Sequence, residues 1–487
     1  MFLTRNESGV NMKIEIKNLG QVKRASIDEK DLTVIVGDNG SGKTLLLEAK
    51  TFIVNYYKKN AEKIIRDINR KFSGDFEFET DWSNIRKFIS ESIETVKVGS
   101  KNPPSSNFIL ENKLKNHVLE NINKFIKEQF EELKQQTINE LNREILMVDE
   151  SELDFTWFET PPTVFSVNHI KCTLTLLDKH LLILEMSSED AEDYEVLNSV
   201  IINLIPKEDY IMKSSMDPEI IKEKEKLYDP INQIKIAMKN NFIFGFFKEI
   251  THSGNTLYLP SERNLFMDDA LTKTLKESYD SRYSFNRNNS KIRFSEFLFN
   301  MAYLNHKDRL NRLKKMDFEL EPELQKIFGG QIVFDEEGDI KSIVKKDGST
   351  IKRELFSTKQ NRLIPYLIIN TPFIHYSNVI IEEPEAHLSL KSIRELLGYF
   401  KFLIDRGIKI TITTHSDVFF NHLNNFILKD KSLETKVYEL KFYGDESILE
   451  EKTLTELGYE IDLFTEELNN LYDETLSIQD NNEQAEN

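Results

Sequence analysis

Residues 32–49 have the sequence LTVIVGDNGSGKTLLLEA, in which two apolar runs flank a glycine-rich turn. The run 32–36 is typical of a buried strand, and the run that begins at Thr44 is typical of a helix. The glycines between them let backbone N–H groups turn toward an anion at the helix N-terminus, where the helix dipole also favours negative charge. The spacing therefore predicts a phosphate-binding loop, formed by Gly37, Asp38, Asn39, Gly40, Ser41, Gly42, Lys43 and Thr44.

The last two residues of this loop carry the chemistry of a nucleotide site. Lys43 can reach the β- and γ-phosphates of a nucleotide, and the hydroxyl of Thr44 can ligate Mg²⁺. The alternative is an accidental glycine-rich turn. A chance match to this spacing is rare in a chain that has only 17 glycines among 487 residues. We therefore expect ATP and Mg²⁺ as cofactors.

Residues 378–387 have the sequence NVIIEEPEAH, an apolar strand that ends in two adjacent acids. Such a pair puts one carboxylate beside the Mg²⁺ and the other where it can orient an attacking water. We assign the metal side to Glu382 and the general base to Glu383. The alternative is that these acids only favour the first turn of a helix after Pro384.

A histidine ends another apolar run, ITITTHS at residues 410–416. A neutral imidazole at the end of a buried strand can hydrogen-bond to the γ-phosphate or to the attacking water. A single histidine at a strand end is more often a structural hydrogen-bonding group. The position of His415, about 30 residues after the paired acids, favours the catalytic interpretation.

Strand and helix patterns alternate at both ends of the chain, which predicts one α/β core interrupted by a large insertion. Residues 1–52 form the first part of this core and 251–460 the second part. Between them, 53–250 form a mainly helical insertion or lid with strands expected at 163–186, a candidate region for oligomerisation or partner binding. Short strand patterns and Gly-containing turns predict an antiparallel β-meander within the second part, at 331–351. Residues 461–487 are acidic and are predicted to be a disordered tail.

The composition excludes several classes of protein. A net charge of −18 gives no support for a general nucleic-acid binder, although a local basic groove stays open. The single cysteine, Cys172, excludes an internal disulfide framework and a cysteine-based zinc site. No apolar run has the length of a signal peptide or a membrane span, so we expect a cytoplasmic protein without a membrane partner.

The order of these motifs resembles that of the ABC-type ATPases of the RecF/SMC/OLD group. The resemblance covers residues 12–52 and 257–425, and it is closest to bacterial phage-defence ATPases that lack a fused nuclease, such as those of the Septu and PARIS systems. It implies an ABC-type head domain, slow ATP hydrolysis, and two heads that pair with two nucleotides between them.

The resemblance extends to three further segments. The group has a signature loop that closes over the nucleotide of a second subunit, and it corresponds here to Ser357, Thr358, Lys359 and Gln360. Lys359 replaces a glycine of that loop, which either weakens hydrolysis or supplies a cation in trans; a helix N-cap is the alternative role of the segment. His387 stands in a loop that contacts the partner head, and Arg263 belongs to a Pro-Ser-Glu-Arg segment expected near the nucleotide.

From this resemblance we expect a homodimer or a higher even-numbered homo-oligomer, in which ATP joins the heads and hydrolysis releases them. The leading hypothesis is a sensor and scaffold of an anti-phage defence system. It would control a separately encoded effector, expected to be a nuclease because this chain has no acidic cluster at nuclease spacing. The alternatives are a DNA repair or chromosome-maintenance ATPase that clamps DNA, and a transport ATPase. A DNA clamp needs grouped Lys and Arg, and the basic stretches 307–315 and 341–353 are short.

Overall fold

The computed structural model of the 487-residue chain describes most of its residues. The described residues are 13–72, 74–96, 102–157, 161–164, 169–177, 181–188, 196–203, 229–247, 250, 255–263, 293–312, 322–335, 339–371 and 374–486. The chain divides into two compact units. The core unit comprises 1–53, 138–158 and 254–487, and the inserted unit comprises 54–137 and 159–253.

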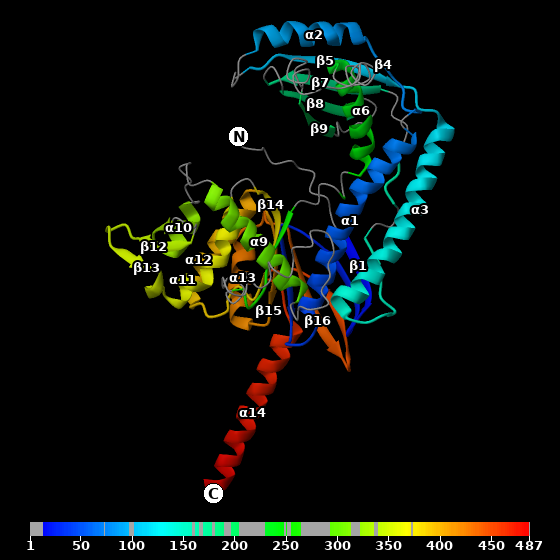
Figure 1. The fold of residues 1–487 in the computed structure, drawn as a ribbon. Coiled ribbons are helices and arrows are strands. Elements are labelled where there is room, and N and C mark those ends of the chain that lie inside the picture. The colour runs from blue at the N-terminus through cyan, green and yellow to red at the C-terminus, as the bar shows by residue number, and fades with distance from the viewer. Residues whose placement is uncertain are drawn as a thin grey trace. The chain divides into compact units, whose positions relative to one another are not determined.

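A nine-stranded sheet forms the centre of the core unit, in the order β10-β14-β15-β3-β16-β17-β2-β1-β6 (Figure 1). Five neighbouring strands are parallel: β10 (Asn255–Leu259), β14 (Tyr376–Glu382), β15 (Lys409–Thr414), β3 (Leu32–Gly37) and β16 (Thr435–Tyr443). The rest of the sheet is mixed and contains β17 (Glu446–Lys452), β2 (Val22–Asp28), β1 (Lys13–Leu19) and β6 (Asp154–Thr156). All six residues of β3 are buried, as its uninterrupted apolar run predicts for a parallel strand covered on both faces.

Several helices of the core unit directly follow a parallel strand in the chain. The core-unit helices are α1 (Lys43–Phe72, which continues into the inserted unit), α9 (Phe294–Arg312), α10 (Pro322–Phe328), α11 (Thr358–Leu363), α12 (Leu390–Asp405), α13 (Asp417–Lys429) and α14 (Asp462–Glu486). In α12 the buried apolar residues recur three and four positions apart, which gives the helix one face for the hydrophobic core. Ser389 and Ser416 cap α12 and α13, each accepting a hydrogen bond from a first-turn backbone N–H.

The predicted α/β class is confirmed, and so is the antiparallel β-meander. The meander consists of β11 (Gln331–Phe334), β12 (Ile340–Val344) and β13 (Thr350–Lys352). Two 3₁₀ helices, Arg353–Leu355 and Ile364–Asn370, flank α11. A π-helical turn lies at Asn142–Leu146, in the segment 138–158 of the core unit.

The inserted unit combines helices with strands. It contains an antiparallel five-stranded sheet: β4 (Phe78–Glu79), β5 (Ser105–Asn112), β7 (His169–Leu176), β8 (Leu181–Ser188) and β9 (Val196–Asn203). Helices α2 (Trp82–Thr95) and α6 (Pro230–Phe246) pack against this sheet. Helix α3 (Asn116–Leu141) packs against α1 through the ring pairs Tyr57–Phe130 and Phe72–Phe125. Every second residue of 169–176 is buried, and β7 and most of β8 fall within 163–186, the part of the insertion where the sequence predicted strands.

The acidic C-terminal segment was predicted to be disordered, whereas the structure places it in α14, a helix from Asp462 to Glu486. Its apolar residues recur at helical spacing, and this periodicity outweighs the acidic composition that motivated the prediction of disorder. Among the residues that the structure describes, no helix is long and apolar enough to cross a membrane.

Candidate nucleotide-binding site

The phosphate-binding loop joins β3 to α1 at the carboxyl edge of the parallel strands. Gly37 is the last residue of β3 and Lys43 the first of α1. Gly40 and Gly42 have φ angles of 79° and 101°, which L-residues rarely adopt, so the glycines at these two positions are required by the backbone. The N–H of Ser41 donates to the carbonyl oxygen of Asp38 over 3.2 Å and closes the turn.

The loop is packed closely from behind. A Cβ atom on Gly37 would lie 2.9 Å from the carbonyl oxygen of Leu440 in β16, and one on Gly42 would lie 2.7 Å from Cγ2 of Val22 in β2. The Ser447 hydroxyl in β17 donates to the carbonyl oxygen of Ser41 over 2.8 Å. Strands β2, β16 and β17 therefore fix the shape of the loop.

Lys43 points its ammonium group at the loop itself. Its Nζ atom donates to the carbonyl oxygens of Gly37 and Asp38 over 2.7 and 2.9 Å. Burial lowers the pKa of Lys43, and the nearby carboxylates of Glu383 and Asp38 oppose that shift. An anion beside the ammonium would restore part of the lost solvation, which is the arrangement that a phosphate group requires.

The first of the paired acids, Glu382, ends β14 and is held on both carboxylate oxygens. Its Oε1 accepts a hydrogen bond from the Tyr258 hydroxyl over 2.8 Å, and its Oε2 accepts one from the Ser261 N–H over 3.1 Å. Arg263 donates from Nη1 to the Glu382 backbone carbonyl over 2.9 Å and is only 1% exposed. Arg263 therefore supports the end of β14 from within the core and does not line the cavity described below.

The second acid, Glu383, adopts a left-handed backbone with φ 45°, which is uncommon for a non-glycine residue. Its N–H donates to the carbonyl oxygen of Thr413 in the neighbouring strand β15 over 2.9 Å. Its Oε1 lies 3.2 Å from Nδ1 of His415, which follows directly after β15. The strand register thus brings together an acid and a histidine that the sequence predicted, each by itself, as catalytic residues.

The next acid stabilises the turn that follows this pair. Glu385 Oε1 accepts a hydrogen bond from the Thr414 hydroxyl over 2.5 Å. Burial raises the pKa of the Glu385 carboxyl. His387, at the end of the same turn, is exposed and has a positive φ of 63°. The turn therefore directs His387 outward, away from the residues around Lys43.

A cavity of about 280 Å³ opens above the loop. It brings together the carboxyl ends of β3, β10, β14 and β15, the edge at which ligands bind in open α/β sheets. Its lining residues are Gln21, Asn39, Gly40, Gly42, Lys43, Thr44, Leu45, Ser261, Arg293, Glu382, Glu383 and Thr413. Loop residues, both paired acids and one additional arginine thus face one space.

Five of these lining residues were not among the predicted site residues: Gln21, Leu45, Ser261, Arg293 and Thr413. Gln21 lies in the turn between β1 and β2, and its side-chain amide donates to the carbonyl oxygen of Gly40. Ser261 follows β10. Arg293 precedes α9 and places Nε 3.7 Å from Oε1 of Glu48 in α1. Ser261 belongs to the Pro-Ser-Glu-Arg segment that the sequence analysis placed near the nucleotide, whereas Gln21 and Arg293 lie in segments without a motif.

Glu48 is a buried acid next to this cavity. It is 4% exposed, and its Oε1 accepts hydrogen bonds from the Ser295 N–H and hydroxyl over 3.0 and 2.6 Å. Burial raises the pKa of Glu48, while the bonds to Ser295 and the charge of Arg293 oppose the shift. Glu48 and Ser295 therefore hold the start of α9, and with it Arg293, against α1.

The signature-like segment forms the start of α11 and does not line this cavity. Ser357 caps α11 and forms a capping box with Gln360, which confirms the N-cap geometry that the sequence left open. The Gln360 side chain also donates to the Phe328 carbonyl oxygen over 3.2 Å. Lys359 forms an ion pair with Glu395 in α12 over 2.5 Å, so its charge is compensated within the chain.

Comparison with known proteins gives the family. A family model described as AAA ATPase domain matches residues 12–420, which is most of the chain. The chain belongs to this AAA ATPase domain family. No curated protein matches the chain at a significant level.

Solved structures of SMC head domains are similar over most of their length. An SMC head bound to the C-winged helix domain of ScpA is 13% identical, with 91% of this chain and 97% of that chain covered and a TM-score of 0.32. The SMC head domain from Thermotoga maritima is 10% identical, with coverage of 91% and 98% and a TM-score of 0.28. The Pyrococcus furiosus SMC head with an extended coiled coil, bound to the C-terminal domain of ScpA, is 11% identical, with coverage of 95% and 99% and a TM-score of 0.29. At TM-scores this low, the likeness assigns no role to any residue of this chain.

Proposed function

We propose that this protein hydrolyses ATP to ADP and phosphate, with Glu383 as the general base. The observation that carries the proposal is that Lys43, Thr44 and Glu383 line one cavity at the end of the parallel strands. Phosphoryl transfer to water requires this combination of a cradle for the phosphates and a base that positions the nucleophile. The family of ATPases to which the chain belongs supports the same reaction.

Thr44 and Glu382 are the residues that would hold Mg²⁺. Both line the cavity, and the Glu382 carboxylate accepts two hydrogen bonds, from Tyr258 and Ser261. A carboxylate can accept about four, so Glu382 keeps acceptor capacity for the ion or for one of its water ligands. When bound, Mg²⁺ neutralises charge that develops on the phosphate oxygens.

Glu383 would take a proton from the attacking water. Its carboxylate is held by His415 at 3.2 Å, and its backbone N–H is fixed by the Thr413 carbonyl oxygen. His415 Nδ1 lies beside Oε1, so Oε2 of the Glu383 carboxylate is available to the water. The loop N–H groups and Lys43 bind the phosphates, and Arg293 adds a second positive charge at the cavity wall.

Nucleotide binding is tested with Lys43→Ala. Isothermal titration with a non-hydrolysable ATP analogue should show at least about a tenfold loss of affinity, because a charge-assisted contact to phosphate is removed. Lys23→Ala, which removes an exposed lysine paired with Glu446, is the matched control and should bind like the wild type. Equal affinity of Lys43→Ala and the wild type would contradict the loop assignment.

We further propose that two copies of the chain pair around two nucleotides. Ser357 is exposed on the core unit, as is His387, and neither lines the cavity of its own chain, so both are accessible to a second copy. The ion pair of Lys359 with Glu395 favours a structural role for this lysine over a cation supplied in trans.

A mixing experiment tests the paired arrangement. Lys43→Ala and Ser357→Arg chains should each be nearly inactive alone, the first without nucleotide and the second with a blocked contact. In a mixed pair, the intact loop of one chain meets the intact Ser357 of the other, so activity should return to about a quarter of the wild-type value if pairs form at random. Absence of any recovery would contradict the trans role of Ser357.

The biological role that we propose is sensing and scaffolding in bacterial anti-phage defence, with control of a separately encoded effector, a nuclease by expectation. The motif order around Lys43, Glu383 and His415 supports it through resemblance to nuclease-less defence ATPases. The second candidate is a DNA-clamping ATPase. Phage plating on cells with wild-type or Lys43→Ala protein tests the first role. Salt-dependent, ATP-dependent DNA binding by the purified protein without phage protection would favour the second.

A further inference from the structure

Helix α14 begins against the core unit and continues away from it. Leu463 and Phe464 pack against the hydrophobic core, and the Phe464 ring lies 5.8 Å from that of Phe420 in α13. Beyond this first turn, Figure 1 shows α14 extending away from the sheet of the core unit. The described side chains from Thr465 to Gln479 are all exposed.

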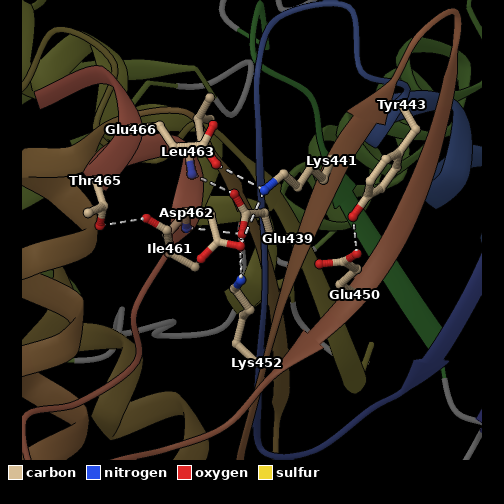
Figure 2. Close-up of polar contacts among 10 residues, drawn as sticks. All are labelled: Glu439, Lys441, Tyr443, Glu450, Lys452, Ile461, Asp462, Leu463, Thr465 and Glu466. Atoms are coloured by element: carbon tan, nitrogen blue, oxygen red, sulfur yellow. Dashed lines mark hydrogen bonds and ion pairs between the residues drawn. The ribbon is translucent and has the colours of Figure 1, made fainter. Parts of the chain in front are cut away.

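A buried carboxylate anchors the start of α14, as Figure 2 shows. Glu439 in β16 is 1% exposed, and its two oxygens accept hydrogen bonds from the N–H groups of Asp462 and Leu463 over 3.1 and 2.7 Å. These are backbone donors that an α-helix leaves without partners in its first turn, and a negative charge there also suits the helix dipole. Glu439 therefore acts as a cap supplied from a neighbouring strand.

Two lysines complete the anchor (Figure 2). Lys452 in β17 contacts Glu439 over 2.7 Å and Asp462 over 3.0 Å. Lys441 in β16 contacts Asp462 over 3.4 Å and Glu466 over 3.1 Å. Because these contacts join the first turn of α14 to two paired strands of the central sheet, they fix the direction in which the helix leaves the core unit.

The projecting part of α14 has an uncovered apolar stripe. Leu468, Leu471, Tyr472 and Ile478 are 57%, 59%, 63% and 53% exposed. Leu471 and Tyr472 follow Leu468 by three and four residues, and Ile478 follows Leu471 by seven, so all four lie on one side of the helix. A stripe of four large apolar side chains on one helix face is typical of a surface that binds a partner.

The charge on the remaining faces of α14 identifies the chemistry of that partner. Between 462 and 486 the sequence has eight acidic residues and no Lys or Arg. Within the part of the chain that the structure describes, Glu467, Asp473 and Glu474 form no ion pair. A second copy of α14 would bring eight further acids against these, and the whole chain is acidic at −18. Like charges across an interface oppose association, so self-pairing of the stripe is disfavoured and a basic surface is complementary.

We propose that α14 is a docking helix for a different protein, one that presents an apolar groove rimmed by Lys and Arg. The apolar stripe would enter the groove and supply affinity, and the acids on either side would meet the basic rim and set the orientation. The anchor at Glu439 makes the helix a preorganised ligand, which lowers the entropic cost of binding. This inference concerns a surface outside the nucleotide cavity and does not depend on ATP hydrolysis.

The test uses the full chain and a labelled helical peptide that carries a leucine stripe flanked by lysines, the simplest surface of the proposed chemistry. Fluorescence anisotropy should show binding that weakens as salt is raised. The double variant Leu468→Gln/Leu471→Gln should lose about tenfold or more in affinity, because two apolar contacts are removed. Glutamine keeps helix propensity close to that of leucine, so the helix itself is retained.

Two further measurements keep the proposal open to refutation. A peptide with serine in place of every leucine should bind at least about tenfold more weakly, which shows that charge alone does not account for the affinity. Sedimentation of the wild type and the double variant reports self-association through the stripe. Binding of the leucine peptide that is unaffected by the double variant would overturn the proposal. So would a wild-type oligomer that the double variant dissociates, because the occupant of the stripe would then be a second copy of the chain.

Discussion

His415 places Nδ1 3.2 Å from Oε1 of Glu383, although the two residues follow different strands. Strands β14 and β15 are parallel neighbours, with Glu382 opposite Thr413 in the register. Each strand therefore delivers its next polar residues to the same edge of the sheet. The phosphate-binding loop can hold a nucleotide, and this pair adds the base that hydrolysis requires.

The first prediction concerns His415. Replacement by alanine removes the imidazole that lies 3.2 Å from the Glu383 carboxylate and limits its positions, so ATP turnover should fall by about ten- to a hundredfold while nucleotide affinity stays within a few-fold of the wild type. His415→Asn keeps a donor near Oε1 and should retain more activity than His415→Ala. Phosphate release and equilibrium nucleotide binding are measured on the same preparations. Equal turnover of His415→Ala and wild type would remove His415 from the mechanism.

The second prediction compares two glycines of the loop. Gly40→Ala meets no atom within 4 Å and has only its positive φ to accommodate, at a cost of about 1–2 kcal/mol in unfolding free energy. Gly42→Ala has a positive φ and also a contact of 2.7 Å with Val22, a buried residue of β2. Overpacking of this kind adds about 1–3 kcal/mol.

Thermal unfolding without nucleotide, followed for both glycine variants, checks this order. Nucleotide affinity should also fall more in Gly42→Ala, because Val22 and the loop must separate. A larger loss of stability in Gly40→Ala than in Gly42→Ala would contradict the packing described behind the loop.

The third prediction concerns acid stability and a buried histidine. His306 in α9 is 4% exposed and lies 2.9 Å from the Thr371 hydroxyl through Nδ1. That hydroxyl donates to the Ile368 carbonyl oxygen over 2.5 Å, so the histidine donates to it from Nδ1. Burial lowers the pKa of His306 to about 4.

Because folding lowers the pKa of His306, the unfolded state takes up a proton at a higher pH than the folded state. The free energy of unfolding is therefore highest above the ordinary pKa of about 6.5 and falls as the pH drops toward 4. The contribution of His306 amounts to about 3 kcal/mol across that interval. His306→Asn supplies an amide donor in place of Nδ1 and has no titrating group, so its stability should fall less between pH 7 and pH 4. Urea unfolding of both proteins at several pH values measures the difference; parallel curves would show that His306 is not the titrating group.

The fourth prediction concerns Arg293, which only the structure identified. Arg293→Gln should lower ATP affinity by about tenfold, because a positive charge at the cavity wall is removed. Lys23→Gln removes a charge from an exposed pair elsewhere and is the control. If Arg293→Gln binds ATP as tightly as the wild type, the Arg293 side chain does not contact the nucleotide.

The sequence predicted those parts of the fold and site that depend on contiguous patterns. The loop from Gly37 to Thr44, the acids at 382 and 383 and the histidine at 415 each end an apolar strand, and adjacent parallel strands bring such ends together. Arg293 and Gln21 could not be found in this way, because they reach the cavity from segments without a motif. Their positions depend on side-chain contacts with Glu48 and Gly40.

Two expectations differ from the structure. The acids of 461–487 favoured disorder, although Leu468, Leu471 and Ile478 keep a helical period. Arg263 was expected near the nucleotide, but its burial beside the Glu382 carbonyl gives it a supporting position. In each case composition or resemblance was given more weight than periodicity or packing.

The most direct test of the account is single-turnover hydrolysis by Glu383→Gln, with nucleotide affinity measured in parallel. We expect nucleotide affinity within a few-fold of the wild type and hydrolysis slower by about 10²–10⁴-fold, because the phosphate-binding loop stays intact while the general base is lost. Glu354→Gln, an exposed acid outside the cavity, is the control and should hydrolyse at the wild-type rate. Hydrolysis by Glu383→Gln at the wild-type rate would contradict the assignment of Glu383 as the general base.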